Sequence, residues 1–306
     1  MRAIDVDCEV PGLSETPAGT KIVGPDGPDR LLPPADYGFA NYQHIFQKRA
    51  SAKSEPAVEE AEDESTASKA ERAADNIVRL MDEANIEVSI LSTVSRTVAV
   101  PAVRRHPERL KAFAYLSPYD GMRSVRELER LVREEGLLGL DVGALWDQLP
   151  ASDRRFYPLY AKCVELDVPV RIYTGMSYAN DRPYDLGHPS HVDSVAVDFP
   201  ELRIAADLSG WPWVNEMVGI LRRHPLVYST TSGHRPRHFA TQGSGWEQFL
   251  QFGNTLLQDR VMVGMSVASF GLTRSELIAE VLALPLKDAV AEKWLYSNAA
   301  RFFRIE

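Results

Sequence analysis

Short runs rich in Val, Ile and Leu alternate along the chain with longer stretches in which apolar residues recur at helical spacing. Turn-forming residues follow each short run, which is typical of strands that end in loops. We expect eight strands, at 3–8, 87–92, 111–116, 137–142, 168–173, 202–207, 226–230 and 261–266. Strands that alternate regularly with helices favour a parallel sheet.

The stretches between the strands predict amphipathic helices. Ala73, Ile77, Leu80 and Ala84 recur every three or four positions, and Ser68 with Glu71 resembles a capping box at the start of that helix. A last helix is expected around 289–301. Eight strand–helix units predict an α/β protein with a closed (β/α)8 TIM barrel. A doubly wound open sheet is the alternative, but no G-x-G-x-x-G follows any of the strands.

Residues 50–76 differ from the rest of the chain because they are mostly Ala, Glu, Ser, Asp and Lys. A stretch of this composition cannot bury enough apolar surface to fold by itself. We therefore expect an acidic, flexible insertion within a single barrel domain that spans 1–306. A docking element for a partner protein is the alternative interpretation.

Charge and hydropathy narrow the class of protein. The 306 residues include 34 Lys and Arg against 43 Asp and Glu, a net charge of −9, which argues against binding to duplex nucleic acid. No apolar stretch approaches the roughly 20 residues that span a bilayer, and the start of the chain lacks the features of a signal peptide. The 2 Cys cannot form a disulfide scaffold. We expect a cytoplasmic protein that binds no membrane and acts on a small molecule.

Polar residues gather where the expected strands end, and in a (β/α)8 barrel the chemistry lies at those carboxyl ends. Asp5, Asp7 and Glu9 share one side of the first strand if side chains alternate with period two. The other strand ends carry Asp141, Arg171, Tyr173, Asp207, Thr230, Ser232 and Ser266. The predicted opening of the barrel therefore holds several carboxylates, an arginine and a phenol.

Several segments, in order, resemble the amidohydrolase-related family of metal-dependent barrels, the aminocarboxymuconate-semialdehyde decarboxylase-like enzymes. They are IDVDCEV, RLMDEANIEVSILS, RRHPERLKAFAYLSP, EEGLLGLDV, DRRFYPLYAKCVELDVPVRIYTG, HPSHVDSVAVDFPELRIAADLSGWPWVNEM and EKWLYSNAARFFRI. The resemblance implies a TIM barrel over nearly the whole chain except the acidic insertion. It also implies decarboxylase, hydrolase or hydratase activity and, from family habit, a homodimer.

The resemblance also locates the family's metal ligands, and this chain departs from all of them. The family's His-x-His pair falls on Asp7 and Glu9, two further histidines fall on Tyr173 and Asp207, and an aspartate falls on Ser266. Zinc typically has His among its ligands, and Tyr and Ser are poor ligands at neutral pH. We expect no metal cofactor. An oxygen cage of Asp7, Glu9 and Asp207 around Mn²⁺ or Mg²⁺ is the alternative.

Without a metal, the crowded carboxylates themselves become the candidate catalytic groups. Like charges and burial raise the pKa of at least one of them, which makes it a general acid, while another remains a base. We expect Asp7, Glu9 and Asp207 in these roles, with Tyr173 as a hydrogen-bond donor to the substrate. His234 is an alternative acid or base, because the unperturbed imidazole pKa is about 6.5.

A basic loop, from His234 to His238, follows the seventh expected strand. Its Arg235 and Arg237 suit a substrate carboxylate or phosphate. Arg171 either pairs with a carboxylate inside the barrel or anchors an anionic substrate. The other residues predicted to bind substrate are Asp141, Ser266 and Trp211.

The predicted function is that of a metal-independent decarboxylase (a lyase) or hydrolase that acts on a small cyclic or aromatic carboxylate. The alternative is a barrel without activity that serves as a scaffold or regulatory subunit. In that case the carboxylates only hydrogen-bond to one another.

Overall fold

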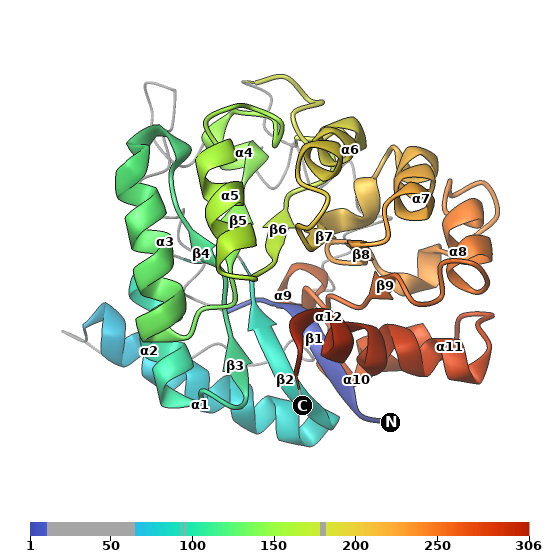
Figure 1. Cartoon of the computed structure of the whole chain (residues 1–306). Helices are drawn as coiled ribbons and strands as arrows, with labels where there is room; N and C mark the ends of the chain where they lie inside the picture. Colours follow the sequence, from blue (N-terminus) through green and yellow to red (C-terminus); the bar gives the residue numbers. More distant parts are fainter. Residues whose placement is uncertain (11–64, 93, 95, 178–181, 306) are drawn as a thin grey trace.

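Parallel strands alternate with helices along the chain in the computed structural model, which describes residues 1–10, 65–92, 94, 96–177 and 182–305 (Figure 1). The strands are β1 (Ala3–Cys8), β2 (Ile86–Leu91), β3 (Leu110–Lys111), β4 (Ala114–Tyr115), β5 (Leu140–Val142), β6 (Val170–Ile172), β7 (Ile204–Ala206), β8 (Val227–Thr230) and β9 (Val261–Met262). Each of the eight expected strands is found, and β3 with β4 are the two parts of the third. The prediction of eight strands is confirmed.

The strands close into a barrel. Parallel pairing runs from β1 to β3 and from β4 to β9. Between β3 and β4 the chain stays in the wall, since the amide of Leu138 donates to the carbonyl of Ala112 at 2.8 Å. At the other seam the amide of Val6 donates to the carbonyl of Val263 at 3.1 Å. The predicted (β/α)8 TIM barrel is therefore the observed architecture.

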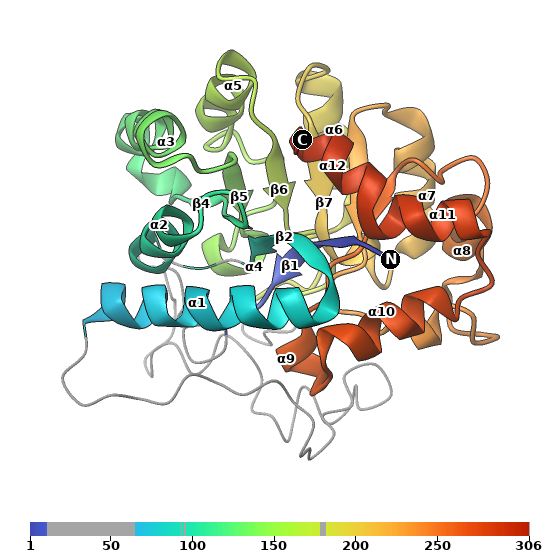
Figure 2. The ribbon, with the colours of Figure 1, turned by 90° about the horizontal axis from the view of Figure 1, so that it is seen from below.

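Helices surround the strands in both views (Figures 1 and 2). They are α1 (Thr66–Ala84), α2 (Arg96–Arg105), α3 (Met122–Glu135), α4 (Ala144–Asp147), α5 (Tyr157–Glu165), α6 (Pro189–Asp198), α7 (Val214–Arg223), α8 (Glu247–Gly253), α9 (Val267–Phe270), α10 (Arg274–Leu282), α11 (Asp288–Glu292) and α12 (Asn298–Phe303). A π-helical turn, Lys293–Ser297, joins α11 to α12, so the predicted C-terminal helix is confirmed. No helix in the described part of the chain is long and apolar enough to cross a membrane.

The start of α1 corrects two expectations. The helix is capped by Ser65, whose side chain accepts a hydrogen bond from the amide of Ser68 at 3.2 Å, so Ser68 lies inside the helix and is not its cap. The acidic stretch predicted as an insertion is helical from Thr66 onward, because small and apolar residues such as Ala73 give it a face that packs into the core. The remainder of that stretch, 50–64, lies outside the described residues.

The amino ends of the strands are closed by α12. Phe302 and Phe303 pack against strand residues inside the barrel, with ring centroids 4.8 Å from Tyr228 and 6.0 Å from Phe113 respectively. Arg203, directly before β7, donates to the carbonyl of Phe302. Because apolar side chains fill this end, any binding site has to lie at the carboxyl ends of the strands, which we call the mouth.

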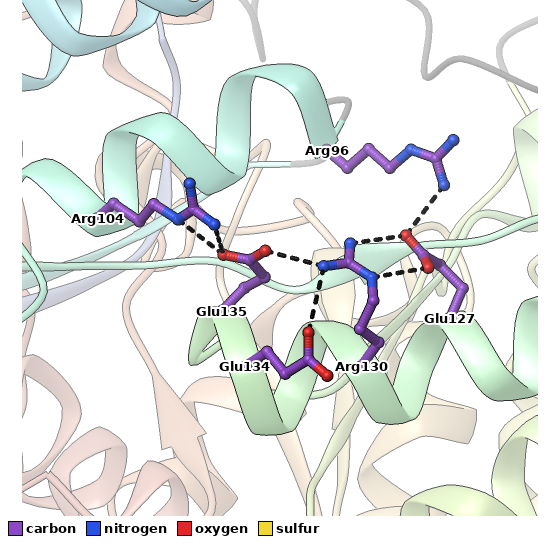
Figure 3. Close-up of polar contacts among 6 residues, drawn as sticks. All are labelled: Arg96, Arg104, Glu127, Arg130, Glu134 and Glu135. Carbon is purple, nitrogen blue, oxygen red and sulfur yellow. Dashed lines mark hydrogen bonds and ion pairs between the residues drawn. The ribbon is translucent and has the colours of Figure 1, made fainter.

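A network of ion pairs joins α2 to α3 on the outside of the barrel (Figure 3). Its members are Arg96, Arg104, Glu127, Arg130, Glu134 and Glu135. Glu135 is nearly buried and lies 2.6 Å from Arg104 and 2.9 Å from Arg130. Its hydrogen bond from Arg130 is the main reason that the pKa of Glu135 lies below its usual range. The network ties two neighbouring helices of the outer layer together.

Candidate functional site

Asp7 receives hydrogen bonds from two other strand ends in the mouth. It lies near the end of β1 and is partly exposed, whereas most of that strand is buried. The hydroxyl of Ser92, directly after β2, donates to Oδ1 of Asp7. The hydroxyl of Ser266, beyond β9, donates to Oδ2 at 2.6 Å. Both oxygens of this carboxyl group therefore accept hydrogen bonds from side-chain hydroxyls.

Asp207 is the second carboxyl group of the mouth and follows β7. The hydroxyl of Thr230 donates to its Oδ1 and lies 2.8 Å from the hydroxyl of Ser232. Burial, and then the negative charge of Asp7, raise the pKa of Asp207 to about 6, against the opposing charge of Arg171. The sequence predicted that burial and like charges would raise the pKa of one carboxyl in this group, and both act on Asp207.

The backbone has unusual φ angles directly after Asp207 and at Ser266. Leu208 and Ser209, directly after Asp207, both have left-handed φ angles, of 58° and 49°, and Ser266 has a φ of 42°. Such angles in residues other than glycine cost about 1–3 kcal/mol each and cluster at functional sites. The hydroxyl of Ser209 donates to the carbonyl of Thr230 at 2.6 Å, which holds the turn in place.

Gly264 allows Asp7 and Ser232 to lie close together. A Cβ atom at position 264 would lie 2.1 Å from the hydroxyl oxygen of Ser232 and 2.8 Å from Cβ of Asp7. Both distances are far below ordinary van der Waals contact. The two polar side chains therefore fit over this point of the wall only because residue 264 has no side chain.

Arg171 is buried and paired with Asp141. Its Nε and Nη2 atoms lie 3.1 and 2.7 Å from the two carboxylate oxygens, and Nη1 donates to the carbonyl of Leu91 at 3.1 Å. Burial would lower the pKa of Arg171, but the charge and hydrogen bonds of Asp141 outweigh it and raise that pKa. The charges of Asp207 and Asp7 act in the same direction. Of the two roles considered for Arg171, the structure supports pairing within the barrel.

Tyr173 lies close enough to Asp207 for the carboxylate charge to raise the pKa of its phenol, although burial is the larger cause. Its hydroxyl donates to the carbonyl of Met176 at 2.7 Å. The proton that we expected Tyr173 to offer to a substrate is therefore engaged by the loop after β6.

The prediction that Asp5 shares a side with Asp7 is wrong. The register of β1 against β2 shifts between Asp5 and Cys8, which breaks the period of two. Asp5 is fully buried and accepts hydrogen bonds from the amides of Asp7 and Met265, both at 3.0 Å. Burial raises the pKa of Asp5 to about 7, and the charge of Arg274 on α10 opposes it.

Arg274, on α10, contacts the end of β1 from the helix layer. Its Nη2 lies 3.1 Å from the sulfur of Cys8, which is buried in the core. Glu9 is partly exposed, and its charge contributes to raising the pKa of Arg274. The structure therefore places Glu9 near Arg274.

His234 lies against two tryptophans. Its ring centroid is 5.5 Å from that of Trp211 and 5.1 Å from that of Trp246. The Nδ1 atom is 3.1 Å from the carbonyl oxygen of Ser232, so this nitrogen carries the proton. Burial lowers the pKa of His234 to about 4, and the ring is neutral at neutral pH. Residue type alone gives the unperturbed imidazole pKa and does not reveal this burial.

The two arginines of the basic loop do not converge. Arg235 is buried and its guanidinium donates twice to Glu280 on α10, once at 3.3 Å from Nε. Arg237 is exposed, with Nε 3.3 Å from Nε2 of His238. Arg235 therefore points to the helix layer and Arg237 lies at the surface, so the two arginines do not form the expected binding site for a carboxylate.

Two residues of the mouth were missed from the sequence. Ser92 ends the second predicted strand, and the rule that found Asp207 would have found it. Asp147, on the short α4, is almost completely buried, and the hydroxyl of Tyr115 donates to its Oδ1 at 2.8 Å. Burial raises the pKa of Asp147 to about 7. A four-residue helix after β5 leaves no periodic signal that could have identified it.

Two of the positions at which the resemblance places metal ligands carry hydroxyl groups, Ser266 and Tyr173, that are poor ligands for a divalent metal. The hydroxyl of Ser266 donates to Asp7, and that of Tyr173 donates to a carbonyl. Neither offers the deprotonated oxygen that a metal prefers. Within the described ranges no three His, Cys, Asp or Glu side chains form a cluster that could hold a metal ion.

Comparisons with known proteins agree with this architecture. The family model described as amidohydrolase matches residues 25–305. Over 59 residues the chain is 42% identical to a 2-keto-4-carboxy-3-hexenedioate hydratase of Sphingobium sp., a match that covers 18% of this chain and 17% of the hydratase.

Solved structures resemble the whole chain at low sequence identity. A TIM-barrel protein of Bordetella bronchiseptica superposes with a TM-score of 0.69 at 22% identity, covering 100% of this chain and 99% of the other. The 5-carboxyvanillate decarboxylase of Novosphingobium aromaticivorans, solved with bound manganese, gives a TM-score of 0.62 at 16% identity and covers 99% and 97%. At these identities the likeness shows the fold.

Proposed function

Because the chain belongs to the amidohydrolase family, we propose that it is an enzyme that decarboxylates a small cyclic or aromatic carboxylate without a metal. The observation that carries the proposal is the state of Asp207. It lies at the end of β7, and burial together with the charge of Asp7 raises its pKa to about 6. A carboxyl group of this kind can donate a proton near neutral pH, which is what a general acid requires.

In the proposed reaction Asp207 protonates the ring carbon that bears the substrate's carboxylate. The bond between that carbon and the carboxylate then breaks, and its electron pair stays with the ring as CO₂ leaves. Asp207 then takes up a proton from the solvent, so that one solvent proton is consumed for each CO₂ released. The overall change replaces the carboxylate by hydrogen, and no oxidant or reductant is needed.

Asp7 and Arg171 set the charge around this acid. The hydrogen bonds from Ser92 and Ser266 hold the carboxyl group of Asp7 in place, and its charge helps to raise the pKa of Asp207. Arg171 provides positive charge close to both carboxylates, although Asp141 engages its guanidinium directly. We propose that the substrate's carboxylate lies toward Arg171.

Hydrolysis of a C–O or C–N bond is the alternative reaction. There Asp7 would take a proton from water, and an electrophile would have to polarise the carbonyl. The two candidate donors for that task, Tyr173 and Arg171, donate to Met176 and Asp141. This engagement favours decarboxylation over hydrolysis.

Release of CO₂ from a panel of aromatic carboxylates, including 5-carboxyvanillate, tests the proposal. The protein is first treated with a chelator and its metal content is measured. We expect turnover by the treated wild-type protein and loss of turnover in Asp207→Asn. Turnover that disappears on chelation and returns with Mn²⁺ would overturn metal independence. A folded wild-type protein without turnover on any member would favour the scaffold alternative.

A further inference from the structure

A buried carboxyl group on the wall of the mouth takes no part in the proposed reaction. Asp147 is 1% exposed, and its Oδ1 accepts the hydrogen bond of Tyr115. Its Oδ2 is buried and has no hydrogen-bond partner among the described residues. Buried carboxylate oxygens are nearly always hydrogen-bonded in proteins, so an oxygen left without a donor calls for an explanation.

Strand register places Tyr115, the hydrogen-bond partner of this carboxyl, beside Asp141 in the wall. Tyr115 lies two residues after Phe113, which packs inside the barrel, so both side chains point inward. In the pairing of β4 with β5, Tyr115 is aligned with Asp141, the partner of Arg171. The carboxyl of Asp147 therefore lies beside the part of the mouth where we place the substrate's carboxylate.

Contacts other than those of the carboxyl also hold α4 against the wall. The hydroxyl of Tyr119 donates to the backbone carbonyl of Asp147 at 3.0 Å. A Cβ atom at Gly143 would lie 2.6 Å from the ring of Trp146 and 3.0 Å from that of Tyr115, which shows how closely the start of α4 packs against the wall. These contacts hold the helix together with the hydrogen bond from Tyr115, while burial of the carboxyl adds a desolvation penalty.

We propose that Oδ2 of Asp147 accepts a hydrogen bond from a hydroxyl or amino substituent on the ring of the substrate, and so selects substituted ring acids over unsubstituted ones. The inference rests on the proposed function, because it takes the ligand to be a ring carboxylate. Asp147 is then a specificity-determining residue, and Asp207 remains the acid.

Equilibrium binding tests this subsite without relying on turnover. Calorimetry would measure the affinity of the wild-type protein for benzoate and for its ortho, meta and para monohydroxy and monoamino derivatives. At least one derivative should bind more tightly than benzoate. Asp147→Asn replaces the accepting Oδ2 by an amide group, and we expect it to weaken binding of that derivative about tenfold and to leave benzoate unchanged.

A matched control and a stability measurement separate binding from structure. Asp153→Asn makes the same chemical change at a nearby carboxylate that pairs with Arg155, and it should change no affinity. The melting temperature of Asp147→Asn should not fall, because the substitution removes a buried ionisable group. If the carboxyl had a purely structural role, Asp147→Asn would instead lower the melting temperature and weaken the binding of benzoate as much as that of its derivatives.

The outcomes distinguish this inference from the proposed reaction. If Asp147→Asn changes no derivative's affinity relative to benzoate, the subsite is refuted while the reaction stands. If the affinities change as expected but no acid is turned over, the subsite stands and the reaction is refuted. Wild-type protein that binds none of the acids would overturn both, and a preference confined to hydroxyl or to amino derivatives would identify the donor.

Discussion

Replacing Gly264 by alanine should displace Asp7 or Ser232, and so disturb the pair of carboxyl groups Asp7 and Asp207, while the barrel stays folded. The new Cβ atom would lie 2.1 Å from the hydroxyl oxygen of Ser232 and 2.8 Å from Cβ of Asp7. Ordinary contacts are 3.4–4 Å, so at least one of these side chains has to move by about 1 Å or more. The movement would separate Ser232 from Thr230 or shift Asp7 relative to Asp207.

The substitution should affect the rate of the reaction much more than the stability of the fold. Overpacking of this kind costs about 1–3 kcal/mol of stability, which a domain of this size tolerates. A displacement of about 1 Å in a catalytic group lowers the rate roughly a hundredfold. We therefore expect Gly264→Ala to lose most of its kcat while it keeps a cooperative unfolding transition.

The assay compares kcat and the melting temperature of Gly264→Ala with those of Gly219→Ala. Gly219 lies exposed in α7, and a Cβ there would meet no atom within 4 Å. The control should keep full activity and gain up to about 1 kcal/mol of stability from helix propensity. Wild-type activity in Gly264→Ala would refute the claim that this close approach positions the acids.

Further measurements test other parts of the structure. Arg171→Met leaves the carboxylate of Asp141 buried without its cation and should cost about 3–5 kcal/mol in urea unfolding. The double variant Arg171→Met with Asp141→Leu should recover most of this loss, and equal losses in both would argue against the pair. The rate of decarboxylation should fall as pH rises through about 6, because Asp207 has to be protonated; a rate that rises over this range would contradict the assigned role. The pKa of Glu135 is depressed in the folded protein, so its contribution to stability is present above the unfolded pKa and lost as pH falls through the folded one. Glu135→Gln should accordingly lower the melting temperature at pH 7 and change it less at pH 3. The homodimer stays a prediction, and sedimentation equilibrium would test it.

The barrel could be predicted from the sequence because its signal is repeated. Each strand is a short apolar run that ends in polar residues, and the same rule located Asp7 and Asp207 in one mouth. The rule failed where the local period changes: the register shift after Asp5 turns that residue toward Arg274. A period of two cannot reveal a shift that depends on pairing with β2.

The burial of His234 and the ion pair of Arg235 could not be predicted from the sequence. His234 is neutral because two tryptophans bury it, and one of them, Trp246, lies on a different part of the loop. Arg235 turns to Glu280, which is 45 residues away in the chain. Contacts of this range depend on how the helices of the outer layer pack, and residue type alone does not specify them.

The most direct test of the central claim is a titration of the carboxyl group of Asp207 by NMR in protein labelled with ¹³C at aspartate carboxyls. The resonance is assigned by its loss in Asp207→Asn. We expect a midpoint near pH 6 in the wild-type protein and a lower midpoint in Asp7→Asn, because the charge of Asp7 helps to raise the pKa of Asp207. A carboxyl that titrates at the ordinary aspartate value, about 3.9, in both proteins would contradict the role of Asp207 as a general acid tuned by Asp7.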